Sequence, residues 1–415
     1  MDNGIEYLRG KLAQKAVRVD LRYQYYEMKN QMRKVSALIP KEFQALTYAL
    51  GWCGKAVDVL SDRIVFDGFD NDIAQLNQIY KLNNADVLHG SAVLSALISA
   101  CSFLYIGRNA DGYPSIECID GGNATGKIDP TTNLLTEGYA ILKRDDYGTP
   151  ELEAYFLPYR TEYYQNGKLV DTFAHKAPYP LLVPVIFRPD ARRPFGHSRI
   201  SRACMEIVQT ALRTLLRTEV AAEFYSVPQK YGLGLEDELI QKIKDNPANA
   251  SLKSFLAFSR DEDGQLPTLG QFQSMSMAPF LDQVKMSASL FAAETGMTLD
   301  DLGFTTENPS SEEAIKASHE NLRLTARRAQ QTFGTGFLNA GYLAACVRDR
   351  FEYQRYAFAD ICPAWMPIFE PDAAALGVIG DAILKINQAA DGFMGARNIR
   401  ALTGMRSDAQ DGDAS

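Results

Sequence analysis

Residues 196–234 read GHSRISRACMEIVQTALRTLLRTEVAAEFYSVPQKYGLG, and this stretch decides how the rest of the chain is interpreted. Ser198 suits the start of a helix, and apolar residues follow at helical spacing as far as Val227-Pro228. A helix over 198–226 would be about 40 Å long at 1.5 Å per residue. Its apolar stripe consists of Ile200, Ala203, Ile207, Ala211, Leu215 and Val220, broadened by Val208, Leu212 and Leu216. A helix with so long and broad a stripe must pack on neighbours.

The segments after this helix follow an informative order. A polar insert occupies residues 227–276, with a short helix predicted over 236–244 and a strand-like piece near Ser254. A second helical pattern covers 277–295, and a polar loop over 305–311 precedes a third helix over 312–347. Acidic residues at 312 and 313 would stabilise the positive end of that helix. The order helix, insert, helix, loop, helix is typical of a protein that lines a channel.

The first 190 residues predict an α+β arrangement, with helices before strands. Helical spacing recurs over 4–33, 43–64 and 73–82, and an acidic cluster at 70–72 suits the cap of the last of these. After Tyr113, short β-rich runs alternate with turn dipeptides, of which Asn166-Gly167 is the strongest hairpin signal. A last strand and loop begin at Pro184.

The C-terminal region after the third helix is short. Residues 355–369 read as a strand that returns to the α+β part, and Pro371 begins a small helical tail that ends near Met405. The last ten residues have a disordered composition.

Composition restricts the possible functions. The 415 residues, 46% of them hydrophobic and 23% charged, fit a folded protein with two or three domains. A net charge of −8 argues against a protein that grips nucleic acid over a broad surface. The six cysteines and four histidines are scattered, so neither a zinc site nor a disulfide framework is predicted. The N-terminus has no secretory signal, which makes the cytoplasm the expected place of synthesis.

Residues 87–107 carry no formal charge and approach the length of a membrane span. Serines at 91, 95, 99 and 102 recur at helical spacing and form a small polar stripe. A helix buried inside the protein is therefore the better interpretation.

The run GGNATGK at 121–127 matches half of a phosphate-binding loop and raises the alternative of a nucleotide-binding enzyme. Ile128 cannot supply the hydroxyl that Mg²⁺ needs, and Asp129-Pro130 prevents the helix that should follow. A glycine-rich turn between strands is the favoured interpretation. Paired carboxylates elsewhere have no His, Cys or third acid at ligand spacing, so no catalytic residue, metal or cofactor is predicted.

One dense basic cluster stands out in the sequence RPDARRPFGHSR, residues 188–199. Such a cluster either contacts phosphate or pairs with acidic residues of a neighbouring subunit, and the acidic balance of the chain favours the second. Its members are Arg188, Arg192, Arg193 and Arg199.

Phe187-Arg-Pro, FGHSRIS and the helix through RTLLRTEVAAEFYSVPQKYGLG resemble the point where portal (head-to-tail connector) proteins of tailed double-stranded DNA bacteriophages pass from wing to stem. The run Asn308-Pro-Ser-Ser-Glu-Glu-Ala-Ile-Lys resembles the tunnel loop of that family and the start of its long kinked helix. The resemblance covers most of the chain, in order.

The resemblance implies a portal-like α+β fold with an α/β wing, a two-helix stem, a small α/β clip and a short helical crown. The implied divisions are 1–198 wing, 199–226 stem helix, 227–276 clip, 277–303 second stem helix, 304–311 tunnel loop, 312–371 long wing helix with returning strand, and 372–415 crown and tail.

The resemblance also implies a non-enzymatic ring, usually of twelve subunits, at the portal vertex of the capsid, assembled in the host cytoplasm. Implied partners are other copies of the chain, the double-stranded DNA in the channel, the terminase large subunit, the head-tail adaptor, and the major capsid and scaffolding proteins; no membrane is implied. The implied tunnel-loop residues are Thr305, Thr306, Glu307, Asn308, Pro309, Ser310 and Ser311. The clip residues expected to contact terminase or adaptor are Lys230, Glu236, Asp237, Lys242, Lys244, Lys253 and Arg260.

Two alternatives remain open. One is the nucleotide-binding enzyme that would use residues 121–127, and it predicts that Lys127→Ala abolishes ATP binding. The other is a different ring-forming virion protein, such as an adaptor. An adaptor needs no helix pair on either side of a separate lobe, so the order of segments disfavours it.

Overall fold

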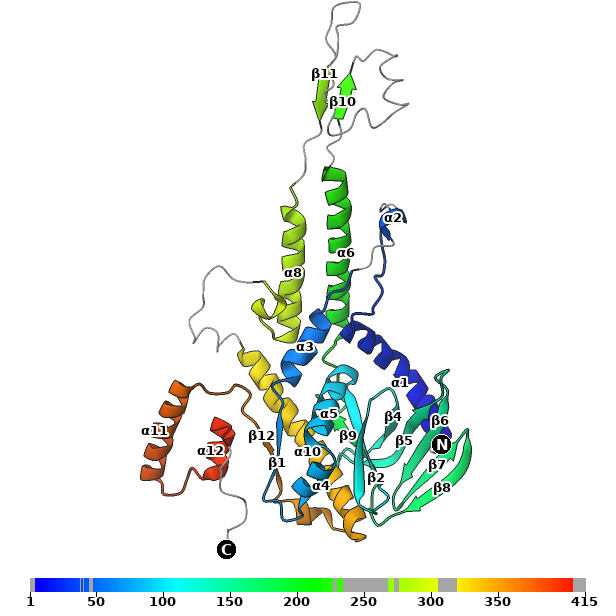
Figure 1. Cartoon of the computed structure of the whole chain (residues 1–415), viewed down its shortest axis with the longest axis vertical. Coiled ribbons are helices and arrows are strands. Elements are labelled where there is room, and N and C mark those ends of the chain that lie inside the picture. The colour runs from blue at the N-terminus through cyan, green and yellow to red at the C-terminus, as the bar shows by residue number, and fades with distance from the viewer. Residues whose placement is uncertain are drawn as a thin grey trace, which may run out of the picture. The chain divides into compact units, whose positions relative to one another are not determined.

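The computed structural model describes residues 4–37, 39, 41–44, 48–226, 230–233, 268–271, 276–304 and 319–405 (Figure 1). The chain divides into two compact units. Unit 1 comprises Met1–Asn30, Leu50–Glu206 and Phe291–Ser415, and unit 2 comprises Gln31–Ala49 and Ile207–Leu290. Helices and antiparallel sheets occur together, which confirms the predicted α+β class.

The centre of unit 1 is a three-stranded antiparallel sheet covered by two helices. The strands, in the order β3-β2-β9, are Pro114–Ile119, Cys101–Arg108 and Leu182–Ile186; the helices are α5 (Ala85–Ser99) and α10 (Glu320–Asp349). Ser102 donates a hydrogen bond to the Ala92 carbonyl of α5, and its neighbour Val185 lies against Gly336 of α10. Paired residues point to the same face of a sheet, so both helices cover one face.

A five-stranded antiparallel sheet lies on the other side of β2. Its strands, in the order β4 to β8, are Ala124–Ile128, Leu135–Arg144, Pro150–Leu157, Arg160–Gln165 and Lys168–Ala174. The hydroxyls of Tyr105 and Tyr163 join the two sheets at 2.7 Å. Asn166 and Gly167 connect β7 to β8 with φ angles of 48° and 77°, as a two-residue hairpin of this composition requires. The predicted hairpin is confirmed.

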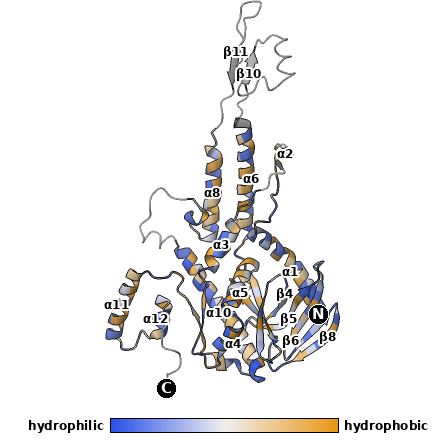
Figure 2. Ribbon diagram, in the orientation of Figure 1, coloured by the Kyte–Doolittle hydropathy of each residue, from blue (hydrophilic) through white to orange (hydrophobic). Residues whose placement is uncertain are grey.

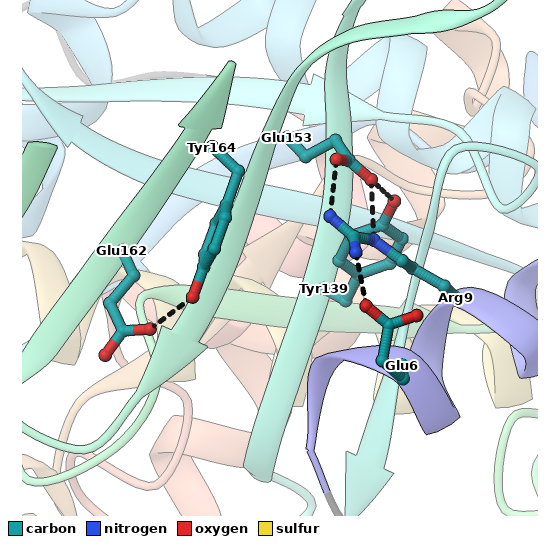
Figure 3. A network of polar contacts seen from close by, with 6 residues as sticks. All are labelled: Glu6, Arg9, Tyr139, Glu153, Glu162 and Tyr164. Carbon is teal, nitrogen blue, oxygen red and sulfur yellow. Dashed lines mark hydrogen bonds and ion pairs between the residues drawn. The ribbon is translucent and has the colours of Figure 1, made fainter. Parts of the chain in front are cut away.

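Helix α1 (Ile5–Tyr26) packs on this five-stranded sheet through apolar contacts and through the polar network shown in Figure 3. Leu8 and Leu12 cluster with Tyr139 of β5. Arg9 donates two hydrogen bonds to Glu153 of β6, at 3.0 and 2.6 Å, and the hydroxyl of Tyr139 donates to the same carboxylate. Although burial opposes it, Glu153 raises the pKa of Arg9 above its ordinary value. The bidentate pair fixes the helix in one orientation on the sheet.

An aromatic cluster closes the other end of unit 1 around His89 of α5. Its ring lies 4.3 Å from Phe66 of β1 (Phe66–Asp70), 4.8 Å from Tyr80 of α4 (Leu76–Leu82) and 4.6 Å from Phe337 of α10, centre to centre. Burial lowers the pKa of His89 to about 3. The imidazole is therefore neutral and serves as a core aromatic residue.

Unit 1 has six further elements within the described residues. They are α3 (Trp52–Ser61), the single turns η2 (Asp300–Leu302) and η3 (Arg355–Phe358), the strand β12 (Cys362–Trp365), and the helices α11 (Ala373–Ala389) and α12 (Ala396–Thr403). Strand β12 pairs antiparallel with β1. Asp372 accepts a hydrogen bond from the amide of Ala375 and caps α11, which confirms the helical tail predicted after Pro371.

Three element predictions need correction. Residues 87–107 are not one helix, because α5 ends at Ser99 and β2 begins at Cys101 after Ala100 with φ 85°. Residues 48–50 are not helical, so the predicted helix over 43–64 is replaced by the end of α2 (Lys41–Gln44) and a separate α3. The returning strand begins only at Cys362, after the η3 turn. Within the described residues, no helix has the length and hydropathy needed to cross a bilayer.

Candidate functional site

The long helix predicted after Ser198 is α6 (Arg202–Ser226). Its cap is Ser201, whose hydroxyl accepts a hydrogen bond from the amide of Cys204 at 3.1 Å. Ser198 instead donates to the Ile98 carbonyl at 2.6 Å and lies before the helix. The prediction of Ser198 as the cap was wrong by one turn, because two serines precede the apolar run and sequence cannot show which of them has a competing partner.

Helix α6 buries one stripe of its circumference and leaves other apolar side chains of the helix half-exposed. Cys204, Val208, Ala211, Leu212 and Leu216 are the apolar residues that it buries. By contrast, Ile207, Leu215 and Val220 stay partly open to solvent. Both sets of residues belong to the broad apolar pattern seen in the sequence, so a single chain covers only part of that pattern.

Helix α6 also holds the segment of unit 2 that follows α1. The buried side chain of Gln209 accepts a hydrogen bond from the amide of Arg33 at 2.8 Å and donates one to the carbonyl of Gln31 at 3.0 Å. A glutamine that satisfies both ends of its amide in this way fixes an otherwise irregular backbone.

The second helix of the predicted pair is α8 (Ala278–Thr295), which agrees with the expected span of 277–295. Its inner face buries Ser287 and Ala288. Met286 and Leu290, 56% and 55% accessible to solvent, lie on the opposite face, and Leu281, 60% accessible, lies near the start of the helix on the side of Ala288. Figure 2 shows hydrophobic residues along both α6 and α8. These side chains have no cover within the described part of the chain.

The charges on α6 and α8 are mixed and sparse. The basic residues are Arg202, Arg213, Arg217 and Lys285, and the acidic ones are Glu206, Glu219, Glu223, Asp282 and Glu294. Arg213 donates a hydrogen bond to Thr210 of its own helix at 3.0 Å. The two helices therefore present little net positive charge to a polyanion.

Arg199 does not share the surface expected for the basic cluster. It is 7% exposed, and its guanidinium donates hydrogen bonds to the carbonyls of Ala56 and Thr295, at 3.2 and 2.5 Å. Burial lowers its pKa to about 10. All of these contacts lie inside unit 1, so Arg199 ties α3 to the end of α8 and does not fit a role in binding phosphate or a neighbouring subunit.

The rest of the predicted cluster is at the surface. Arg188, Arg192 and Arg193 are exposed, and Asp190 accepts hydrogen bonds from the amides of Arg192 and Arg193, at 2.8 and 2.7 Å. His197 and these amides lower the pKa of Asp190 to about 2. The carboxylate thus organises the turn, in which the side chain of Arg193 lies 3.3 Å from Nδ1 of His197.

Sequence reasoning missed a second group of basic residues, on α1. Lys11, Lys15, Arg18 and Arg22 recur at intervals of four, three and four, which places them on one face of the helix. We name this group the α1 basic stripe. The spacing was available in the sequence, but the interpretation of residues 4–33 as an apolar-and-charged helix did not separate cations from anions.

The tunnel-loop residues 305–311 lie outside the described residues, and so do six of the seven clip residues, from Glu236 to Arg260. Lys230 belongs to β10 (Lys230–Leu233), which pairs antiparallel with β11 (Thr268–Gln271). Strands at both ends of the insert thus pair with each other. The predicted helix over 236–244 and the strand-like piece near Ser254 are also outside the described part of the chain.

The glycine-rich run at 121–127 is a turn followed by a strand, as the favoured interpretation predicted. Gly121 and Gly122 form a turn after β3, and Gly126 and Lys127 belong to strand β4, where Lys127 pairs with Glu137 at 3.6 Å. A phosphate-binding loop instead leads directly into a helix. Among the described residues no group of His, Cys, Asp and Glu is placed to hold a metal ion, and the six cysteines are free.

Comparisons with known proteins identify relatives over most of the chain. The portal protein of Mycobacterium phage L5 is 25% identical over 342 residues, which cover 77% of this chain and 69% of the relative. That of Mycobacterium phage D29 is 27% identical over 349 residues, with the same coverage. No protein-family profile matches the chain.

Two solved structures show a weaker likeness. A chain of the virion of a native gene transfer agent particle is 13% identical, with a TM-score of 0.47, and the match covers 86% of this chain and 90% of that one. A chain of the neck of this particle, determined with C12 symmetry, is 14% identical, with a TM-score of 0.48 and the same coverage.

The two mycobacteriophage relatives agree with the family that the sequence resembles. Their alignments span three quarters of the chain, more than a single shared motif would give. Over most of its length, the chain is similar to bacteriophage portal proteins.

Proposed function

We propose that this protein forms a ring, of about twelve subunits as is usual in its family, at the portal vertex of the capsid, where it serves as the conduit for DNA. The observation that supports the ring is the uncovered apolar surface of α6 and α8. Met286 and Leu290 are each more than half exposed, on a helix whose opposite face is buried, and Leu281 is 60% exposed near the start of the same helix. Exposed apolar side chains gathered on one element mark a surface for association.

A closed ring covers such a surface when each subunit offers two different faces to its neighbours. In a heterologous interface the outer face of α8 in one subunit meets another face of the next subunit, and rotation closes the circle. The half-exposed stripe of Ile207 and Leu215 on α6 supplies a second apolar face. We propose that these two stripes meet between adjacent subunits.

The sparse positive charge of α6 and α8 supports a channel through which DNA slides. Each phosphate contact adds to the hold of a protein on DNA, so a channel wall must make few such contacts. Residues 305–311, which lie in sequence between the second stem helix and the long wing helix, would form the tunnel loop nearest the DNA. Residues 227–276 would form the clip that contacts the terminase large subunit during packaging and the head-tail adaptor afterwards.

The other partners and places follow from the same assignment. Residues 1–198 and 312–371 would form the wing that meets the major capsid and scaffolding proteins, and 372–415 a short crown. The ring would assemble in the host cytoplasm and remain in the virion. The chain itself would be structural, and the motor activity would belong to the terminase.

The conduit is tested by shortening residues 305–311 to a minimal glycine linker. We expect rings to form as before, because the apolar stripes of α6 and α8 are unchanged, while packaging or retention of DNA declines. Assembly is measured by native mass and packaging by the nuclease-protected DNA in heads. Failure of the rings to form would make the loop a structural element and contradict the assignment.

The clip is tested by charge reversal in the insert. Lys242→Glu with Lys244→Glu should weaken binding of the terminase large subunit to assembled rings, measured by co-sedimentation. The matched control is the reversal of Lys81 and Lys176, which lie at the surface of unit 1. Equal loss of terminase binding in both variants would remove the support for a specific clip contact.

A further inference from the structure

The α1 basic stripe is an uncompensated array of positive charge in an acidic protein. Lys11, Lys15, Arg18 and Arg22 extend over about 16 Å of helix, given 1.5 Å per residue. None of the ion pairs within the described residues involves any of the four. The neighbouring Arg9 on another face of α1, by contrast, has two carboxylate partners.

Main-chain carbonyls and aromatic rings hold the stripe in place. Lys11 donates a hydrogen bond to the carbonyl of Gly126 at 2.6 Å, Lys15 to that of Ala124 at 3.3 Å, and Arg22 to that of Ser99 at 3.0 Å. These bonds orient the cations but leave their charge unneutralised, since a carbonyl supplies only a partial charge. An ammonium has three donors and a guanidinium five, so further donors remain for a ligand.

The turn that contains Arg192 and Arg193 extends this array. Lys11 and Lys15 both lie over the ring of Phe195, at 5.0 and 5.7 Å from its centre, which places that turn beside the stripe. Burial lowers the pKa of Arg22, and repulsion from Arg18 and Arg193 lowers it further. Burial and the charges of Lys15 and Lys127 likewise lower the pKa of Lys11. The cations are therefore close enough to repel one another, and an anion would relieve that repulsion.

We propose that the α1 basic stripe, together with Arg192 and Arg193, binds the phosphodiester backbone of double-stranded DNA. A linear array of this length suits an extended polyanion, because duplex DNA presents about one charge per 1.7 Å of its axis. Lysine is depleted at protein–protein interfaces, whereas two of the four cations here are lysines. The residues proposed to bind here are not those of the proposed channel, and the binding needs neither the ring nor residues 305–311.

The experiment measures DNA binding by the full chain and one triple variant. Arg18→Gln, Arg192→Gln and Arg193→Gln remove the three exposed cations and spare the half-buried ones, so the fold is retained. The matched control, Lys81→Gln, Lys168→Gln and Lys176→Gln, removes the same charge from exposed positions on other elements of unit 1. Binding of a short fluorescein-labelled duplex is followed by anisotropy across a salt series.

We expect wild type and control to bind the duplex with a steep salt dependence. The triple variant should bind at least about tenfold more weakly at about 50 mM salt, with a slope smaller by about 2.7, because each lost phosphate contact removes about 0.9. Equal affinities of the variant and the control would overturn the proposal. It would equally be overturned if a labelled poly-glutamate peptide bound the wild type more tightly than the duplex, since the stripe would then be a site for an acidic protein segment.

Discussion

The sheets of unit 1 bury their large apolar side chains, whereas the long helices α6 and α8 leave part of theirs exposed. In unit 1 the large side chains of the central strands, such as Phe103, Leu104 and Phe156, are completely buried within one chain. On α8 three large apolar residues are more than half exposed. Unit 1 therefore has the covered core of an independent domain, whereas the helices have the half-covered surface of a subunit that needs a neighbour.

The largest expected effect comes from breaking the exposed apolar face of α8. Leu290→Asp places a charge where we propose that another subunit packs, and burying an unpaired carboxylate there is too costly for the interface to form. We expect rings to be replaced by single chains in analytical ultracentrifugation. Ser289→Asp, the adjacent exposed position, adds the same charge beside the stripe and should leave most rings intact. If both variants assembled normally, this face of α8 would not be an interface.

A second test disrupts the buried ion pair that joins α1 to the five-stranded sheet. Glu153→Ala leaves the guanidinium of Arg9 and the hydroxyl of Tyr139 without their acceptor, and we expect a loss of about 3 kcal/mol in the free energy of unfolding. Glu151→Ala removes a carboxylate two residues away that pairs with the exposed Lys143, and should cost at most about 1 kcal/mol. Urea unfolding in the Leu290→Asp background measures both. Equal losses would show that the buried network contributes nothing particular to the domain.

The stability of unit 1 should depend on pH through the titration of His89. Its pKa is about 3 in the fold, whereas an exposed histidine in an unfolded chain has the ordinary value of 6.5, so the unfolded state binds the proton more readily. Stability is full above the unfolded pKa and falls as the pH falls from 6.5 towards 3. Between pH 7.5 and about 5 the loss from this residue is about 2 kcal/mol.

His89→Phe should remove that part of the pH dependence while keeping an aromatic ring in the cluster. Urea unfolding at the two pH values measures the difference. Phe66→Leu disturbs the same cluster without removing a titrating group, and should retain the full dependence. A His89→Phe variant that lost stability with acid as steeply as the wild type would contradict the account. His175, whose pKa burial lowers to about 4, acts in the same direction and accounts for part of the remainder.

The smallest expected effect concerns the C-terminal helices. Arg400 and Arg397 of α12 pair with Asp67 and Asp70 of β1, at 2.5 and 3.1 Å. Replacing both arginines with alanine should release α11 and α12 to proteases with a cost of about 1 kcal/mol in global stability. Lys385→Ala, on the exposed side of α11, is the control. If limited proteolysis removed the helices no faster from the double variant, the two ion pairs would not be their anchor.

Much of the fold could be predicted from sequence because its signals are local. The Asn166-Gly167 turn, the spans of α6 and α8 and the tail after Pro371 depend on residues near one another in the chain. The change from helix to strand at Ala100 could not be predicted, since residues 87–107 are uncharged throughout and the change depends on pairing with β9. The choice of Ser201 over Ser198 as the cap likewise depends on a distant carbonyl, that of Ile98.

Some features of the candidate site could likewise be predicted from local sequence, and others could not. The apolar stripe of α6 was visible as a pattern, but the half left open by the folded chain, with Ile207 and Leu215, required the structure. Arg199 belongs to a basic cluster in the sequence, but it is buried in the structure. This could not be predicted, because the carbonyls of Ala56 and Thr295 that accept its hydrogen bonds lie far from it in sequence. The α1 basic stripe is local and could have been predicted.

The most direct test of the account is the native mass of the purified chain together with particle images of the same sample. We predict closed rings with a central hole and a mass near twelve times the 46.0 kDa of one chain, which Leu290→Asp converts to single chains. A wild type that remained a single chain in the presence of its capsid and scaffolding proteins, or a compact assembly without a hole, would contradict the proposed conduit.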